Sequence, residues 1–243
     1  MRQCKILGVR VDGVTHAELL SGLDEFVASK QPHQIVTLNP EMLVAAQADT
    51  GFQAMLNQAD LSVADGVGLM LAARLLGCPL PERITGSDEI YRLASHCAVR
   101  GYRPYLLGAA PGVAEKAAER LVALNPGLKM AGTFAGSPRA EEQAEIIGRI
   151  RATEPEVLFV AFGVPAEEIW IARNREPLGV PVMMGVGGAF DFAAGVARRA
   201  PNWMRRAGLE WLHRLAREPW RWRRQLALPR FVFLVLRQRL AGH

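Results

Sequence analysis

Two apolar stretches decide the fold: VLFVAF at residues 157–162 and VPVMMGV at residues 180–186. Both are hydrophobic at nearly every position and lack the alternation of apolar and polar side chains that is typical of a strand with one solvent-exposed face. Such a continuous pattern indicates strands that are buried on both faces, as in a parallel sheet covered by helices. We therefore predict an α/β protein with a mostly parallel sheet flanked by helices.

The chain around these stretches alternates in the same way between apolar runs and helical patterns. Further strands are predicted at residues 34–39, 61–64, 103–107 and 128–133. Helices are predicted at residues 41–58, 67–76, 113–124 and 141–152. Gly77 is suited to cap the second of these helices. No internal repeat or low-complexity linker is present.

Residues 198–243 differ from the rest of the chain in charge. They contain twelve arginines, no lysine and two glutamates, for a net charge of +10. Because the whole chain carries +5, residues 1–197 carry −5. We predict an α/β catalytic domain over 1–197 and a basic, tryptophan-rich appendage over 198–243. Pro201 is suited to begin a helix over 202–216, and Pro219 and Pro229 are predicted to cut the remainder into short helices.

The appendage mixes its arginines with four tryptophans: Trp203, Trp211, Trp220 and Trp222. Tryptophan rings favour the headgroup region of a bilayer and arginines favour anionic lipid, so an anionic membrane surface is the predicted partner. A surface for self-association, giving a homo-oligomer, is one alternative, and nucleic acid is another, although no recognised nucleic-acid motif is present. No stretch reaches the roughly 18 to 20 apolar residues of a spanning helix, and the N-terminus lacks the apolar core of a signal peptide.

Cysteine spacing and the common catalytic motifs exclude several classes of protein. Cys4, Cys78 and Cys97 are far apart and form no CxxC pair, which predicts neither a disulfide framework nor a metal cluster and suits a reducing cytosol. HExxH, GxSxG, a Walker lysine and a metal-holding DxD are all missing from the sequence. We expect no metal and no cofactor.

Candidate site residues follow the predicted strands, because ligands of open α/β sheets bind beyond the carboxyl ends of the strands. Asp65 follows the strand at 61–64 and is a candidate general base; a turn aspartate or a helix N-cap is the alternative. Thr37 and Asn39 end the strand at 34–39 and could bind a polar ligand, or Asn39 could cap the helix that begins at Pro40. The turn at 108–112 is either a phosphate-binding helix start or a plain turn.

Two further groups complete the candidate site. Three glycines within residues 185–188, Gly187 among them, let the backbone approach a ligand, and Asp191 could then bind hydroxyls of a ribose or sugar; a tight packing corner is the alternative. Glu167 follows the strand at 157–162. Arg83 is a candidate phosphate partner, or a surface arginine paired with Glu82 or Asp88.

Seven blocks, taken in order, resemble the WecG/TagA/CpsF family of bacterial glycosyltransferases: TLNPEM, VADGVG, RITGSD, LLGAAPGV, FGVPAEE, GVGGAFDFAAG and RAPNWMRRAGLEWLHRLAREPWRWRR. The resemblance spans nearly the whole chain. It implies a Rossmann-like body with the fold called GT-E and an appendage that docks on the inner face of the cytoplasmic membrane. It also implies transfer of a sugar from a UDP-sugar to a lipid-linked saccharide acceptor, a sugar on undecaprenyl diphosphate, with inversion and without a metal, in the synthesis of surface polysaccharide. N-acetylmannosamine, its uronic acid and glucose are the candidate donor sugars.

The resemblance also suggests roles for single residues. Asp65 matches the proposed general base of the family, and three positions match its pocket: Thr37, Asn39 and Arg83. Arg221 and Arg224 match appendage arginines proposed to reach the lipid diphosphate, and we place Trp211 and Trp220 at the membrane. The family usually has a glutamine where this chain has Glu167; a glutamine can also donate a hydrogen bond, whereas a carboxylate can only accept. The rival functions are a non-catalytic membrane scaffold with a degenerate pocket and an oxidoreductase, which the missing GxGxxG disfavours.

Overall fold

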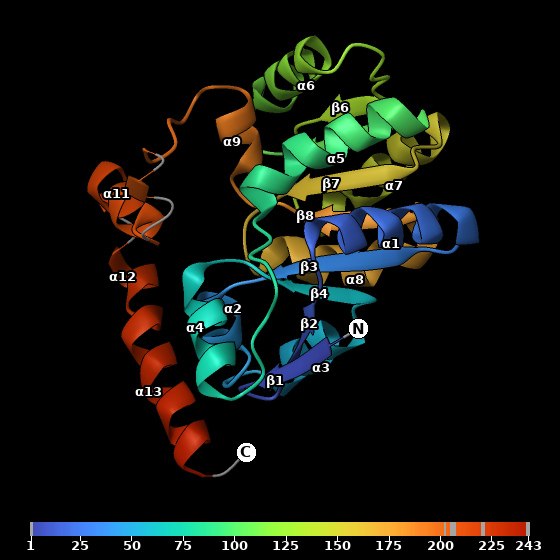
Figure 1. Cartoon of the computed structure of the whole chain (residues 1–243). Helices are drawn as coiled ribbons and strands as arrows, with labels where there is room; N and C mark the ends of the chain where they lie inside the picture. Colours follow the sequence, from blue (N-terminus) through green and yellow to red (C-terminus); the bar gives the residue numbers. More distant parts are fainter. Residues whose placement is uncertain (1, 202, 205–207, 220–221, 242–243) are drawn as a thin grey trace.

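The computed structural model describes residues 2–201, 203–204, 208–219 and 222–241 (Figure 1). Its main sheet has six strands in the order β4-β3-β8-β7-β5-β6, and every neighbouring pair is parallel. The strands are β3 (His33–Leu38), β4 (Leu61–Ala64), β5 (Pro104–Gly108), β6 (Gly132–Phe134), β7 (Val157–Ala161) and β8 (Val182–Gly185). The predicted α/β fold class is confirmed, although β6 is shorter than the strand predicted at 128–133.

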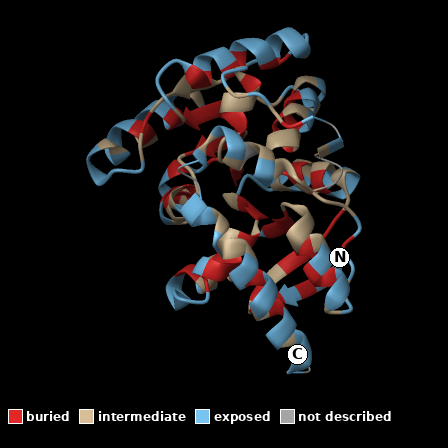
Figure 2. Ribbon diagram, turned by 90° about the vertical axis from the view of Figure 1, so that its left-hand side faces the viewer, coloured by how far each residue is buried: buried red, intermediate tan, exposed pale blue. Residues whose placement is uncertain are grey.

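Helices cover both faces of the sheet, which explains the continuous apolar pattern of its central strands. One layer consists of α1 (His16–Ser29), α5 (Gly86–Arg100), α6 (Val113–Leu124) and α9 (Ala189–Ala193), and it packs on Phe159. The other includes α7 (Gln143–Thr153) and α8 (Ala166–Leu178), and it packs on Leu158 and Val160. Figure 2 shows the buried residues concentrated in the sheet and on the helix faces that are turned toward it.

The helix predicted over residues 41–58 is broken in the structure. It forms α2 (Pro40–Ala45) and α3 (Thr50–Gln58), and the break falls at Asp49, whose carboxylate accepts a hydrogen bond from the Phe52 amide at 2.9 Å. An aspartate in this arrangement caps a new helix, so the local side-chain bond overrides a longer apolar pattern. The predicted helix at 67–76 is α4 (Val67–Leu75), which ends before Gly77.

An N-terminal hairpin and one disulfide were not predicted. Strands β1 (Arg2–Ile6) and β2 (Val9–Gly13) pair antiparallel in a sheet of their own. The hairpin brings Cys4 to Cys78, just after α4, with the two Cα atoms 5.6 Å apart, and the two residues form a disulfide. This corrects the prediction from the spacing, because contact between residues 74 positions apart is set by the tertiary fold. Cys97 is buried and free.

The described part of the appendage is mostly helical, and its last helix packs against the body. It includes α11 (Glu210–Arg217), α12 (Trp222–Gln225) and α13 (Ala227–Leu240) (Figure 1). The single helix predicted over 202–216 is interrupted in the described residues: residues 203–204 are helical, Gly208 lies in a turn at φ +74°, and α11 begins at Glu210. Residues 202 and 205–207 lie outside the described part. Pro229 does not cut the chain as predicted, because it lies in the first turn of α13, where its missing N–H is not needed.

The final helix is attached to the body by both apolar and polar contacts. Phe231 and Val235 are each 3% exposed and belong to the core formed with α2, α3 and α4. The Gln238 side chain accepts a hydrogen bond from the Leu7 amide at 2.8 Å and donates one to the Lys5 carbonyl at 3.0 Å. None of the helices in the described residues has both the length and the apolar character needed to cross a membrane.

Candidate active site

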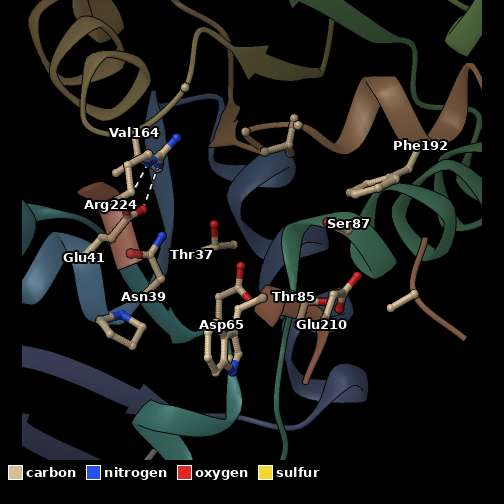
Figure 3. Close-up of a pocket in the computed structure, with 18 of the residues that line it drawn as sticks. Thr37, Asn39, Glu41, Asp65, Thr85, Ser87, Val164, Phe192, Glu210 and Arg224 are labelled. Atoms are coloured by element: carbon tan, nitrogen blue, oxygen red, sulfur yellow. Dashed lines mark hydrogen bonds and ion pairs between the residues drawn. The ribbon is translucent and has the colours of Figure 1, made fainter. Parts of the chain in front are cut away.

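A cavity of about 850 Å³ opens at the carboxyl ends of β3, β4, β7 and β8 (Figure 3). The sheet side of its wall contains seven residues predicted from the sequence: Thr37, Asn39, Asp65, Arg83, Glu167, Gly187 and Asp191. The appendage supplies the opposite wall, with Trp211 and Arg224 among its residues. The turn at 108–112 follows β5 but is not part of the lining. Trp220 and Arg221, predicted to contact membrane and lipid diphosphate, lie outside the described residues.

Asp65 has the properties expected of an acid–base group. The N-cap of α4 is Gly66, at φ +96°, so Asp65 is not the N-cap that was the alternative interpretation. Burial raises the pKa of the Asp65 carboxyl to about 7, Arg83 opposes this rise, and Glu210 adds to it. Figure 3 shows Asp65 pointing into the cavity. A carboxyl with such a pKa exchanges a proton readily near neutral pH.

Thr37 and Asn39 line the cavity while making bonds to the protein itself. The Thr37 hydroxyl donates to the Gly185 carbonyl at 3.3 Å, which joins the ends of β3 and β8. The Asn39 side-chain oxygen accepts from the Met42 amide at 3.0 Å, with Pro40 in the first position of α2. The capping alternative for Asn39 is therefore confirmed, and its side chain also forms part of the wall.

Glu167 holds two loops of the cavity together. It is 1% exposed. One carboxyl oxygen, Oε2, accepts from the Gly163 amide at 2.8 Å, and the other, Oε1, accepts from the Gly187 amide at 3.0 Å. Burial raises the pKa of Glu167 to about 7, although these backbone hydrogen bonds and Arg224 act to lower it. A carboxylate suits two converging N–H donors because both of its oxygens accept.

A second buried carboxyl, that of Glu168, lies next to Glu167 in the chain and was not predicted. Gln34 in β3 donates to Glu168 Oε2 at 2.9 Å, and a Cβ on Gly185 would collide with Glu168 Oε1. Burial, together with the charge of Glu167, raises the pKa of Glu168 well above its usual value. Two adjacent glutamates at the start of α8 were the only signal in the sequence. The packing of the second against β3 and β8 could not be read from it.

Charged side chains connect the appendage to the body around the cavity. Arg224 donates two hydrogen bonds to Glu41, one to each carboxylate oxygen, at 2.8 and 2.7 Å. Arg199 contacts Asp88 at the start of α5 and donates to Glu210 at 3.1 Å. Arg199, Glu41 and Glu210 were not predicted as site residues, because the sequence has no local signal for contacts between segments so far apart.

Across the part of the chain that the structure describes, no group of three or more His, Cys, Asp or Glu residues is arranged to hold a metal ion.

Comparison with known proteins agrees with the resemblance noted in the sequence. A sequence model of the "Glycosyl transferase WecG/TagA/CpsF family" matches residues 4–243. Two relatives are each named "N-acetylglucosaminyldiphosphoundecaprenol N-acetyl-beta-D-mannosaminyltransferase". The protein from Bacillus spizizenii is 36% identical over 86% of this chain and 80% of its own length. The protein from Staphylococcus aureus strain MW2 is 32% identical over 95% of this chain and 91% of its own length. The chain therefore belongs to the WecG/TagA/CpsF family and is a glycosyltransferase.

Proposed function

We propose that this glycosyltransferase moves N-acetylmannosamine from a UDP-linked donor onto the N-acetylglucosamine of an undecaprenyl-diphosphate-linked acceptor. The names of the relatives support this choice among the three candidate sugars. The observation that carries the mechanism is Asp65, a carboxyl with a pKa of about 7 in a cavity of about 850 Å³ at the strand ends. Such a cavity is large enough for a nucleotide-sized ligand.

In the proposed reaction Asp65 takes the proton from the acceptor hydroxyl. The oxygen attacks the anomeric carbon of the donor sugar and forms the new C–O bond there. The bond between that carbon and the diphosphate oxygen breaks, and its electron pair leaves with UDP. Attack from the face opposite the leaving group inverts the anomeric carbon. The Asp65 pKa near 7 divides its population between the two forms, so the base form is available at neutral pH.

Negative charge on the departing UDP requires stabilisation, which we assign to protein groups in place of a metal. Arg83 lies in the cavity on the sheet side, where we assign it to the departing UDP. Arg217 and Arg224 lie on the appendage side, where we assign them to the diphosphate of the acceptor. Guanidinium groups bind phosphate oxygens through two parallel hydrogen bonds. Preorganised donors of this kind stabilise charge that develops in the transition state.

The appendage is proposed to bring this chemistry to the membrane that holds the acceptor. It carries a net charge of +10 and exposes large apolar side chains, including Trp203, Trp222 and Phe233. Cationic and aromatic side chains together favour an anionic lipid surface. We place the protein on the inner face of the cytoplasmic membrane, where a UDP-sugar and a lipid-linked acceptor can meet.

The test is release of UDP from a panel of UDP-sugars, with a short-chain lipid-diphosphate N-acetylglucosamine as acceptor. We expect release that needs the acceptor, prefers UDP-N-acetylmannosamine and continues in EDTA. Preference for the uronic acid or for glucose would correct the donor. Loss of activity in EDTA that returns with Mg²⁺ or Mn²⁺ would overturn the metal-free mechanism. A folded protein that releases no UDP with any donor would overturn the proposed reaction.

A further inference from the structure

A second hollow of about 250 Å³ lies between α4 and α13. Its lining residues are all apolar or glycine; among them are Leu71, Ala72 and Leu75 on α4 and Val232, Val235 and Leu236 on α13. On each helix these residues recur at spacings of three or four, so each helix turns one stripe of its surface toward the other. Figure 1 shows the two helices side by side.

This groove (the α4–α13 groove) combines a fixed floor with exposed rims. Phe231 and Val235 are buried against the body and hold α13 in place. Leu71 on one rim is 62% exposed, and Val232 on the other is 56% exposed. A continuous apolar surface that remains open to water commonly marks a binding site for an apolar ligand.

The α4–α13 groove is continuous with the candidate active site. Gly68, Leu71 and Leu228 line both hollows. Gly68 and Leu228 stand near the starts of α4 and α13, so the groove runs from the cavity along both helices. Arg217 and Arg224 belong to the appendage side of the cavity. The two hollows together therefore offer cationic groups at one end and a hydrocarbon-lined channel at the other.

We propose that the α4–α13 groove binds the isoprenoid units of the lipid-linked acceptor that lie next to its diphosphate. This inference rests on the proposed function, because it assumes an acceptor with a diphosphate and a polyprenyl chain. When the diphosphate contacts the arginines of the cavity, the first isoprenoid units can pass Gly68, Leu71 and Leu228, which line both hollows, and lie in the groove. The occupant is the chain of the acceptor itself, since a bulk lipid or a second protein copy would have no connection to the cavity.

The test is a series of N-acetylglucosamine acceptors whose diphosphate carries a methyl group or one to four isoprene units, assayed without membranes or detergent and below their micelle concentrations. We expect KM to fall by about tenfold or more for each of the first units, because each buries several methylene groups. Beyond the length that fills the groove, KM should level off. If the enzyme turns over the methyl acceptor and KM does not depend on chain length, the proposal that the groove binds isoprenoid units would be wrong. The proposed function would be unaffected. Failure of every acceptor with every donor would instead count against the function.

Paired variants separate the groove from general membrane attachment. Leu75→Gln with Leu236→Gln alters two partly exposed groove residues outside the cavity lining. Phe233→Gln with Leu240→Gln removes two exposed apolar side chains of α13 that are not in the groove. The groove pair should lose most of the dependence of KM on chain length, and the control pair should keep it. If both pairs of substitutions change the dependence of KM on chain length equally, the proposal would be wrong.

Two measurements keep this comparison interpretable. If the groove pair unfolds at a lower temperature than the control pair, Val232→Gln alone, at an exposed rim position, replaces it. The oligomeric state is measured by light scattering for each variant. A change from dimer to monomer in the groove variants, with the chain-length dependence unchanged, would assign the groove to contact between protein copies and would overturn the proposal.

Discussion

The two walls of the cavity differ in how their functional side chains are held. On the sheet side, Asp65 directly follows a strand and is half-buried, and Glu167 begins a helix and is buried. Loss of solvent around each carboxyl raises its pKa to about 7. On the appendage side, Arg224 lies on a helix of four residues, and its side chain is 41% exposed although it is paired with Glu41. The group proposed for proton transfer is thus fixed by the core, whereas the groups proposed to meet phosphate are held by surface contacts.

The difference suggests a division of labour that substitutions can test. Groups in the rigid wall should affect turnover, because proton transfer depends on a fixed geometry and a tuned pKa. Groups in the exposed wall should affect the apparent affinity for the acceptor, because a diphosphate can replace Glu41 as the partner of Arg224.

The largest effect is expected for Asp65→Asn. An amide cannot accept the proton, so kcat should fall by roughly 100- to 10,000-fold, the usual contribution of a general base. Because the Asp65 pKa is higher in the folded state than in the unfolded chain, ionisation of this carboxyl near neutral pH favours unfolding, so the similarly shaped neutral amide should not lower the thermal unfolding midpoint. UDP release and circular dichroism on the same samples measure both. Turnover near that of the wild type in a folded variant would remove Asp65 from the mechanism.

Arg224→Ala should have the next largest effect, on the KM of the acceptor. Loss of a charge-assisted hydrogen bond to the diphosphate should raise this KM by roughly 10- to 100-fold with little change in kcat. Loss of the exposed pair with Glu41 should cost little stability. The matched control is Arg223→Ala on the same helix, because Arg223 lies over the Trp222 ring and is not part of the cavity lining. Equal effects of the two changes would indicate that only the net charge of α12 matters.

The sheet wall could be predicted from the sequence because its signals are local. Apolar runs marked the six parallel strands, and the polar residues that follow them predicted where the cavity opens. Asp65 was a candidate because it follows a predicted strand and because it matches the proposed general base of the family that the chain resembles. Successive residues of a central strand, such as Leu158 and Phe159, pack on helices at opposite faces of the sheet. The continuous apolar pattern predicted this burial on both faces.

The resemblance singled out Arg224 and Trp211 in the appendage wall, but the contacts of this wall could not be predicted, because they join segments far apart in the sequence. Composition indicated a basic, aromatic segment, but Arg224 and Glu41 are 183 positions apart, and Arg199 and Asp88 are 111 apart. No periodicity identifies such partners. For the same reason the Cys4–Cys78 disulfide and the hydrogen bond from the Gly187 amide to Glu167 were not predicted.

Glu167→Gln tests whether the bond between the two loops requires a carboxylate. A glutamine would turn its NH₂ group toward one of two backbone N–H donors, so the loop at Gly187 should loosen and the KM of the donor should rise by about tenfold. The difference from the wild type should grow above pH 7 and shrink below it, because Glu167 is itself protonated below its pKa of about 7. Glu176→Gln, an exposed position on the same helix, is the control. A donor KM equal to that of the wild type at pH 8 would contradict the argument.

The smallest effect is expected for Glu210→Gln. This substitution changes a residue of the appendage wall and tests its effect on Asp65 in the sheet wall. The negative charge of Glu210 raises the pKa of Asp65, so its removal should lower that pKa and move the acid limb of the kcat profile to lower pH. A shift of roughly half a pH unit would make the variant about threefold faster than the wild type at pH 6, where most Asp65 carries a proton, and equal to it above pH 8. The control is Glu218→Gln, which also removes a cavity carboxylate of the appendage, whereas Glu210 is the appendage carboxylate whose charge raises the Asp65 pKa. The acid limb should therefore move further in Glu210→Gln than in Glu218→Gln. If the acid limb moves in neither variant, the charges of the appendage do not affect proton transfer by Asp65. The appendage would then act in the cavity only by binding the acceptor.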